Sequence, residues 1–219
     1  FCKISKKGLI LRNGSQDSMD DINSSDSYKS IAKPTTGIYK ELGSKFISFA
    51  YPVTNEEDIK EIIATIKKEY HDARHHCYAY RLGPEGESWR ANDDGEPSSS
   101  AGKPILGQLL SFQLSDILII VVRYFGGTKL GVPGLIRAYR SAASNAIENG
   151  EFVEKIAGKM VTFTYDYIQM NGIMKLIKDY SAEIINQEFD NICRISVNIR
   201  RGDYERFCTE LETISNKIE

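Results

Sequence analysis

The sequence of 219 residues is poor in cysteine and has no long apolar run. Its four cysteines, at positions 2, 77, 193 and 208, show no paired spacing, which is typical of a reducing compartment, so we expect a cytoplasmic protein. No apolar stretch approaches the roughly twenty residues that a membrane span requires, and we expect no membrane partner. The formal net charge of -2 argues against a broadly basic nucleic-acid-binding surface, so any contact with RNA has to use a local patch.

The first 36 residues carry little of the apolar pattern of a folded domain. The chain begins at Phe1 without methionine, and Met19 is a natural start, so we interpret residues 1–18 as an upstream translated or cloning-derived extension. Residues 20–32 are rich in Ser, Asp and Asn, and such a segment buries too little apolar surface to become ordered. We therefore predict a disordered extension over residues 1–36, with folded structure beginning near Tyr39.

Residues 37–150 show the pattern of a mixed domain of strands and helices. An apolar strand at residues 46–51 ends at Pro52, and a capping box at residues 54–57 opens a helix with isoleucine at core-facing positions. Next come a strand at residues 78–82, a polar loop, a short helix at residues 105–110 and an apolar strand at residues 117–122. A last helix, with Leu135 and Tyr139 on its buried side, stops at Asn149 and Gly150.

A glycine loop joins the apolar strand at residues 117–122 to that last helix. The strand is apolar on both faces and has to be buried, which fixes the residues that follow it at the end of a sheet. Glycines allow positive φ and close backbone approach, so consecutive N–H groups can point at one ligand together with the positive end of the helix. Lysine and arginine side chains add full charges. The candidate residues for binding an anion or RNA are Arg123, Tyr124, Gly126, Gly127, Thr128, Lys129, Arg137 and Arg140.

The glycine loop alone does not name a ligand. It matches neither the P-loop pattern nor the dinucleotide fingerprint, so the prediction is a phosphate or a carboxylate and no particular nucleotide. The alternative is a tight strand-to-helix turn whose glycines serve packing alone. Arg137 and Arg140 favour the anion site, because cations near the start of a helix have an electrostatic cost that a bound anion or a carboxylate partner would offset.

A polar loop at residues 91–104 precedes a helix that Pro104 can start. Turn chemistry explains most of its composition, which includes Asp94-Gly95 and several serines. Its carboxylates, Asp93, Asp94 and Glu96, could instead bind a hard cation or pair with the arginines across the site. Both interpretations stay open at this stage.

A histidine pair lies beside a strand that begins near residue 78. His75-His76-Cys77 would suggest zinc, but neighbours on a strand point to opposite faces and no second ligand pair completes a tetrahedron. We therefore predict no metal and no cofactor, with one histidine facing the core and one facing a pocket. The sequence also lacks a nucleophile elbow. The candidate pocket residues are His75, His76, Arg81, Asp93, Asp94, Glu96, Ser98 and Lys103.

The pattern changes after Gly150 and contains no clustered polar motif. Residues 160–165 alternate as a strand, residues 170–180 show helical spacing, residues 182–189 and 192–199 indicate paired strands, and residues 207–218 form an amphipathic helix. The order βαββα predicts an antiparallel sheet with helices on one side. The fold class is therefore α+β.

Three sequence motifs follow one another in the first of these two regions. They are residues 75–81, residues 93–98 with 101–106, and residues 122–131 with 134–135 and 137–139. In this order they resemble the signatures of the YigZ/Impact family, over residues 40–149. A weaker similarity to the family's bacterial carboxyl-terminal domain covers residues 158–218. Ser99-Ser100 stands where the family often has Gly-Thr, and Val132-Pro133 stands where it often has a small residue and glycine.

The resemblance implies a fold and a cellular role. It implies an Impact-type domain at residues 37–150, similar to domain IV of elongation factor G and the ribosomal-protein fold. It also implies a ferredoxin-like domain at residues 157–219, similar to domain V of that factor. Eukaryotic members regulate translation initiation by competing for the activator of a stress-responsive eIF2α kinase. Shared fold supports RNA or ribosome binding by association only.

Two functional hypotheses follow from the residues and the resemblance. In the first, which we favour, the cationic patch docks RNA, the ribosome or an acidic translation-regulatory protein, and the chain is not an enzyme. In the second, an enzyme acts on a small phosphorylated or carboxylated substrate, with His76 assisting the acidic-loop carboxylates. A cavity shared by Asp93, Glu96 and His76 would favour the enzyme, whereas pairing of these carboxylates with arginines would favour the binding module. The sequence does not indicate an oligomeric state.

Overall fold

The structure, a computed structural model, describes residues 26–189 and 193–214. Its elements before residue 150 are β1 (Ser27–Ile31), β2 (Thr35–Glu41), β3 (Ser44–Pro52), α1 (Glu56–Glu69), β4 (His75–Leu82), β5 (Ser88–Asn92), α2 (Gly102–Ser111), β6 (Ile117–Tyr124) and α3 (Gly131–Glu148). They are followed by β7 (Phe152–Ile156), β8 (Gly158–Tyr165), α4 (Met170–Asp179), β9 (Glu183–Glu188), β10 (Cys193–Arg200) and α5 (Tyr204–Ile214). Short 3-10 turns precede α4 and α5. The expected α+β class is confirmed.

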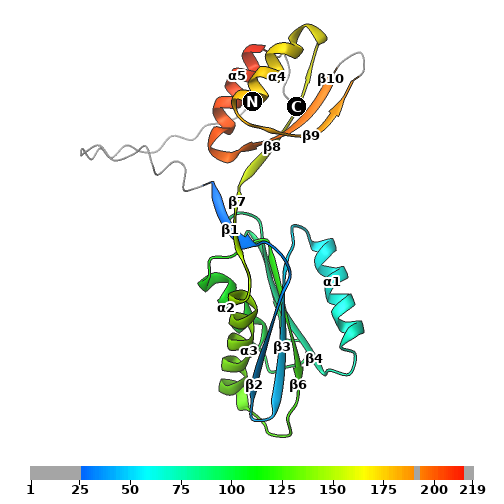
Figure 1. The fold of residues 1–219 in the computed structure, drawn as a ribbon, viewed down its shortest axis with the longest axis vertical. Helices are drawn as coiled ribbons and strands as arrows, with labels where there is room; N and C mark the ends of the chain where they lie inside the picture. Colours follow the sequence, from blue (N-terminus) through cyan, green and yellow to red (C-terminus); the bar gives the residue numbers. More distant parts are fainter. Residues whose placement is uncertain (1–25, 190–192, 215–219) are drawn as a thin grey trace, which may run out of the picture.

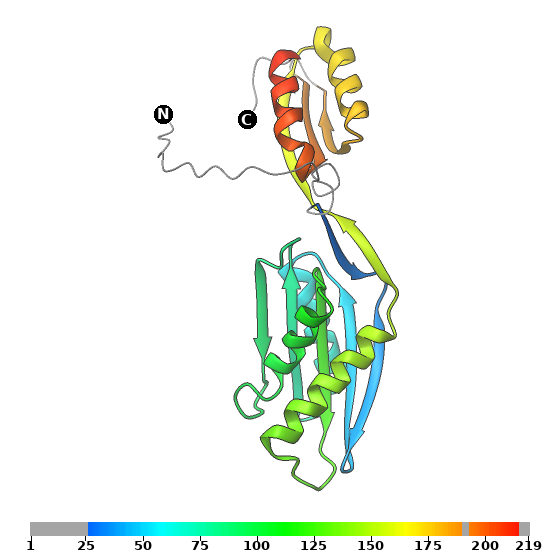
Figure 2. The same ribbon diagram turned by 90° about the vertical axis from the view of Figure 1, so that its left-hand side faces the viewer.

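A five-stranded antiparallel sheet in the order β2-β3-β6-β4-β5 organises the amino-terminal half (Figure 1). α1 lies on one face of this sheet, and α2 and α3 lie on the other (Figures 1 and 2). β6 is the central strand and contributes to both apolar cores. Ile119 and its alternate neighbours pack toward α2 and α3, whereas Ile120 and its alternate neighbours pack toward α1. This two-sided burial explains why the strand is apolar at successive positions.

The carboxyl-terminal half contains a second sheet, in the order β8-β10-β9, with a core of its own. Cys193, Ile195, Val197 and Ile199 are buried on one face of β10, as the alternation predicts. α4 and α5 lie side by side on that face of the sheet (Figure 2). The predicted βαββα order and the helices on one side are therefore confirmed.

The prediction of disorder up to residue 36 is wrong for the part that the structure describes. β1 pairs with β7 as an antiparallel ribbon, and β2 pairs with β3 from Thr35 onward. Ile31 is buried in the amino-terminal core, and the Tyr28 hydroxyl donates to Asp116 at 2.5 Å. The polar composition of this segment suggested disorder. Its order depends on pairing with β7, which lies more than a hundred residues away in the sequence and could not be seen from local composition. The expectations for residues 1–25 lie outside the described residues.

Smaller differences concern the ends of elements. The helix cap is Asn55 rather than Thr54, because the Asn55 side chain accepts the Asp58 N–H at 2.8 Å. α2 begins at Gly102, which places Pro104 in its first turn, and neither β5 nor β7 was expected. Over the described residues, no helix combines the length and the apolar character that crossing a bilayer requires.

Truncation inside β6 is expected to destabilise the fold strongly. Ile119 has 0% exposure, so Ile119→Ala loses apolar burial and leaves a cavity, with an expected cost of about 2–5 kcal/mol in the free energy of unfolding. Ile38→Ala on the edge strand β2, where the side chain is 55% exposed, is the control and should cost less than about 1 kcal/mol. Urea unfolding measures both changes. Equal costs would contradict the central place of β6.

Candidate functional site

A cleft of about 430 Å³ opens where β6 ends and α3 begins. Its volume falls within the range of ligand pockets, roughly 300–1,000 Å³. The glycine loop forms one side and the polar loop before α2 forms another, so the two motifs that the sequence singled out meet here. The cleft is lined by Arg74, His75, Glu96, Pro97, Arg123, Phe125, Lys129, Leu130, Gly131, Val132 and Leu135. Cations and apolar side chains therefore share one cleft.

Arg123 is the buried cation of this cleft. Its residue exposure is 7%, and its Nη1 donates to the Glu96 carboxylate at 2.6 Å. The guanidinium also lies 5.6 Å from the Phe46 ring centroid and 5.8 Å from the Phe125 ring centroid. Its buried Nε has no hydrogen-bond partner among the described residues. Burial of an unsatisfied donor is costly, so Arg123 is held at this position against an energetic penalty.

Glu96 connects Arg123 to a buried hydrogen-bond network. The Tyr139 hydroxyl on α3 donates to the same Glu96 oxygen at 2.8 Å, and the Cys77 thiol lies 3.3 Å from that hydroxyl. Burial raises the pKa of the Tyr139 hydroxyl and of the Cys77 thiol, so both groups stay protonated at neutral pH. The network fixes β4, the polar loop and α3 around one carboxylate.

Asp93 supports the backbone of the polar loop. Its two carboxylate oxygens accept the N–H groups of Ser99, Ala101 and Gly102 at 2.8 to 3.0 Å. These donors include the start of α2, where N–H groups lack partners within the helix. The carboxylate is therefore occupied by structural hydrogen bonds and does not line the cleft.

Asp94 and the histidines form a separate contact at the start of β4. Asp94 accepts the His76 backbone N–H at 2.7 Å and binds the Lys67 ammonium at 3.0 Å. Burial alone would raise the pKa of Asp94, but these two donors outweigh it and hold the pKa below its usual value. His75 Nδ1 lies 2.8 Å from the Asp94 carbonyl, and His76 Nε2 lies 3.0 Å from the Tyr70 carbonyl. His75 lines the cleft, whereas His76, also a pocket candidate from the sequence, is buried and does not line it.

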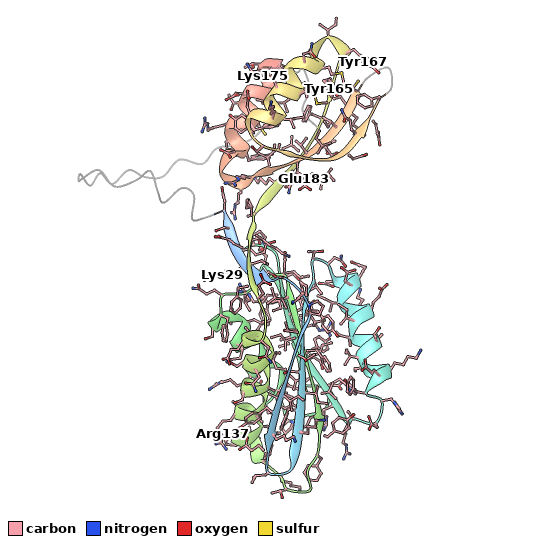
Figure 3. The ribbon with its side chains drawn as sticks, in the orientation of Figure 1. Lys29, Arg137, Tyr165, Tyr167, Lys175 and Glu183 are labelled. Atoms are coloured by element: carbon pink, nitrogen blue, oxygen red, sulfur yellow. The ribbon has the colours of Figure 1, made fainter. Side chains whose placement is uncertain are left out.

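The structure does not gather the four predicted cations at one point. Arg123 and Lys129 share the cleft, whereas Arg137 binds Glu41 at 3.2 Å. Figure 3 shows Arg137 on α3. Arg140 lines a different, open depression beside α2. Residues 137 and 140 are neighbours on the surface of α3. Their side chains nevertheless have different surroundings, Glu41 of β2 for Arg137 and the depression beside α2 for Arg140. The single convergent patch expected from the sequence is therefore not formed.

The remaining candidates lie around the cleft or away from it. Lys103 lines the depression that contains Arg140, and Arg81 donates to the Leu114 and Glu85 carbonyls. A hydrogen bond to Asp72 raises the pKa of Tyr124 to about 12. Ser98 and Thr128 are exposed loop residues.

The glycine loop and the start of α3 meet only part of the expectation for an anion site. The Gly126 N–H is already used, because it donates to the Ser44 hydroxyl at 3.2 Å. Gly127 and Gly131 do have positive φ, at 89° and 69°. α3 is 18 residues long, and its N-cap Leu130 supplies no side-chain hydrogen bond. Its first turn therefore keeps donors that a ligand could use.

Sequence reasoning missed Arg74 and the apolar wall of the cleft. Arg74 directly precedes His75, and this position beside a predicted pocket residue was a usable signal. Phe125, Val132 and Leu135 were not predicted to contact a ligand, because apolar residues beside a glycine loop cannot be distinguished by spacing from core residues. The wall makes the cleft amphipathic.

Comparison with known proteins gives consistent matches over this region and beyond. A family model for the Impact N-terminal domain matches residues 42–147. A Haemophilus influenzae protein named IMPACT family member is 36% identical over 170 residues, which cover 77% of this chain and 82% of the relative. The Escherichia coli K12 IMPACT family member YigZ is 31% identical over 186 residues, covering 84% and 91%. The chain belongs to the IMPACT family.

A solved structure extends the likeness to both halves of the chain. A crystal structure of a hypothetical protein aligns with a TM-score of 0.70 and 30% sequence identity, covering 89% of this chain and 96% of that one. The segment that matches the IMPACT family model includes every residue that lines the cleft. β8, β9, β10 and their two helices follow that segment in the sequence.

Breaking the Arg123–Glu96 pair should destabilise the protein far more than breaking the more exposed pair between Arg137 of α3 and Glu41 of β2. Glu96→Ala leaves a buried guanidinium without its carboxylate, with an expected cost of about 3–5 kcal/mol. The matched control is Glu41→Ala, which removes the partner of the largely exposed Arg137 and should cost less than about 1 kcal/mol. Urea unfolding at pH 7 measures the loss of stability in both variants. Similar losses would be inconsistent with a buried ion pair between Arg123 and Glu96.

Asp94 should make the stability of the protein depend on pH in the acid range. Because its folded pKa lies below the unfolded value of about 3.9, its contribution is fully present above that value and is lost as the pH falls through the folded pKa. Asp94→Asn keeps a residue type that tolerates the φ of 40° at this position. The variant should be less stable than the parent at pH 7, with a gap that narrows toward pH 3. Thermal unfolding at several pH values measures the difference in stability between variant and parent. A difference that stays constant with pH would rule out this linkage.

Proposed function

We propose that this IMPACT family chain is a binding module in the regulation of translation, and that its cleft docks an acidic segment of a partner protein. The role in translation rests on the resemblance to family members that regulate initiation, and the proposal places the protein in the cytosol, where translation takes place. The observation that supports docking most strongly is Arg123. This cation lines the cleft, and its guanidinium lies 5.6 Å and 5.8 Å from the centroids of the Phe46 and Phe125 rings.

The charges around the cleft favour a ligand with few negative groups. Glu96 already neutralises Arg123 in part, which leaves Arg74 and Lys129 as cations at the cleft with no ion-pair partner among the described residues. An RNA backbone would need more cations along its path, and Arg137 and Arg140 lie elsewhere. A peptide with one or two carboxylates matches the charge that is present.

The apolar wall favours a peptide for a second reason. Phe125 and Val132 are 57% and 45% exposed, so the cleft presents apolar surface that an inserted side chain would cover. Arg and aromatic residues together are typical of energetic anchors in protein interfaces. An acidic segment carrying leucine or phenylalanine would use both parts of the cleft.

The alternative of an enzyme is less well supported by the geometry. Asp93 accepts three backbone N–H groups, Glu96 is bound by Arg123 and Tyr139, and His76 is buried away from the cleft. A general acid or base must reach the proton that it transfers. Pairing of Glu96 with an arginine is the arrangement that favours the binding module.

Removing Lys129 should weaken binding without changing the fold. The probe is an acidic peptide with the sequence Ser-Leu-Asp-Phe-Glu and blocked ends, and Lys129→Ala should lower its affinity about three- to tenfold because one rim charge is lost. Lys103→Ala removes an exposed lysine outside the cleft and is the matched control. Fluorescence anisotropy at low and high salt measures both.

Three results would count against the proposal: no salt-sensitive binding of the acidic peptide, equal losses in both variants, or tighter binding of a poly-uridine RNA of similar charge. The last result would assign the cleft to nucleic acid. Circular dichroism and thermal unfolding of each variant establish that the fold is intact.

A further inference from the structure

A second surface of the protein has the properties of a strand-addition site. The three-stranded sheet of the carboxyl-terminal half has the order β8-β10-β9, so β8 is an edge strand within the described residues. The Arg201 N–H donates to the Ala157 carbonyl at 3.0 Å, and the register pairs Val161 with Val197. Arg201 and Ala157 are thus a hydrogen-bonded pair, and such pairs alternate along an antiparallel ladder with pairs that are not hydrogen-bonded. Met160 and Thr162 belong to the second kind, so their backbone N–H and C=O groups point away from β10. These groups form the open edge.

The two edges of this sheet differ in how they are protected. β9 has a register shift opposite Ser196 and Val197, and it carries Glu183 and Glu188 near its ends. Bulges and charges are the usual means by which proteins block an edge. β8 carries one charge, Lys159, near its start, whereas its residues 160–165 contain no charge and no proline and pair with β10 without a shift. Of the two edges that the described residues form, the β8 edge is therefore the less protected.

The helices above the sheet leave room for one more strand. Two packed helices span about 20 Å, at 8–10 Å between axes, whereas three strands span about 14 Å and four span about 19 Å. Both α4 and α5 pack on the three strands. Figure 2 shows α5 in front of β8 and β10. A single added strand beside β8 would match the width of the two helices.

The same widths argue against a second copy of this chain as the occupant. Pairing β8 with β8 of another copy would make a six-stranded sheet about 29 Å wide beneath four helices that need about 40 Å. The helices of the two copies would crowd at the joint. One extended segment, without helices of its own, fits the edge better.

The side of α5 that faces away from α4 carries acidic groups. The Tyr180 hydroxyl at the end of α4 donates to Glu210 at 2.7 Å, so Glu210 lies on the side toward α4. Glu205, Cys208 and Glu212 are spaced three and four residues apart and lie on the opposite side. Burial raises the pKa of the Cys208 thiol, and the charges of Glu205 and Glu212 add to the rise. A hydrogen bond to Tyr204 and the charge of Lys159 act in the opposite direction. The Lys159 ammonium lies 3.9 Å from the centroid of the Tyr204 ring, so this side of α5 has two carboxylates and one nearby cation. The edge beside α5 keeps an excess of negative charge.

We propose that the β8 edge binds an extended segment of a partner protein as a fourth antiparallel strand. The segment has apolar residues on the face beneath α5 and lysine or arginine at its ends, which pair with Glu205 and Glu212. Backbone hydrogen bonds to Met160 and Thr162 supply register and affinity, and the α5 carboxylates supply selectivity. This surface is separate from the Arg123 cleft and takes a segment of opposite charge.

A defined peptide pair tests the proposal on the full chain. The probe is the peptide Lys-Thr-Val-Thr-Val-Thr-Lys with blocked ends, and its counterpart has glutamate in place of both lysines. Met160→Pro removes an edge N–H without removing a bond to β10, and Met160→Thr is the matched control. The lysine peptide should bind at least about tenfold more weakly to Met160→Pro than to the parent and about equally to Met160→Thr.

A double variant changes the charge of α5 and leaves the strands of the sheet as they are. Glu205→Lys combined with Glu212→Lys changes only exposed positions on α5 and should invert the preference, so that the glutamate peptide binds better. Amide hydrogen exchange at Met160 and Thr162 should slow when the lysine peptide is added. Lys129→Ala in the cleft should leave all of these results unchanged.

Several outcomes would overturn the proposal. They are no binding of either peptide at about 1 mM, equal affinity for Met160→Pro and the parent, or an unchanged preference after charge inversion. A concentration-dependent dimer that Met160→Pro abolishes would assign the edge to a second copy and would also overturn it. If Met160→Pro does not fold, the charge inversion and the exchange measurement decide alone.

Discussion

The contact between Arg123 and Glu96 is the constraint on which the rest of the candidate site depends. It joins the end of the central strand to the polar loop, and Tyr139 joins the same carboxylate to α3. A buried ion pair of this kind rarely contributes more stability than apolar residues of the same size. The proposed binding role of Arg123 therefore rests on its place in the lining of the cleft and not on a gain in stability.

The polar loop shows how one segment can combine structural and functional groups. Asp93 satisfies N–H groups at the start of α2, and Asp94 ties the loop to β4 and α1. These contacts hold Glu96 in place, so the loop positions a carboxylate against an arginine instead of presenting several carboxylates to solvent. This arrangement suits a rigid binding surface. The carboxyl-terminal sheet offers a different kind of surface, in which open backbone groups rather than a buried cation would hold the ligand.

Much of the fold could be predicted from periodicity and from the family resemblance. β6 was evident because six successive apolar residues require burial on both faces, and the alternation in β10 identified its buried face. β1 and β7 were not evident, because short polar strands reveal themselves only through a partner that is distant in sequence. A sequence pattern indicates well whether a segment prefers to be a helix or a strand, but it indicates poorly which distant strands pair with each other.

The site was predicted in its composition and not in its geometry. The sequence identified Arg123, Lys129 and Glu96, which do meet at the cleft. It could not show that Arg137 and Arg140 turn elsewhere, because the direction of a helix relative to the loop before it depends on tertiary packing. The apolar wall of Phe125 and Leu135 was hidden for the same reason.

The most direct test of the account is to replace the buried pair by apolar residues and to measure stability and binding together. Arg123→Met combined with Glu96→Leu should leave the free energy of unfolding within about 1–2 kcal/mol of the parent, since a buried pair and apolar residues are often of similar stability. The account predicts that this double variant folds and no longer binds the acidic peptide. Retained binding, with affinity equal to that of the parent, would contradict the claim that Arg123 is kept at this position for a ligand.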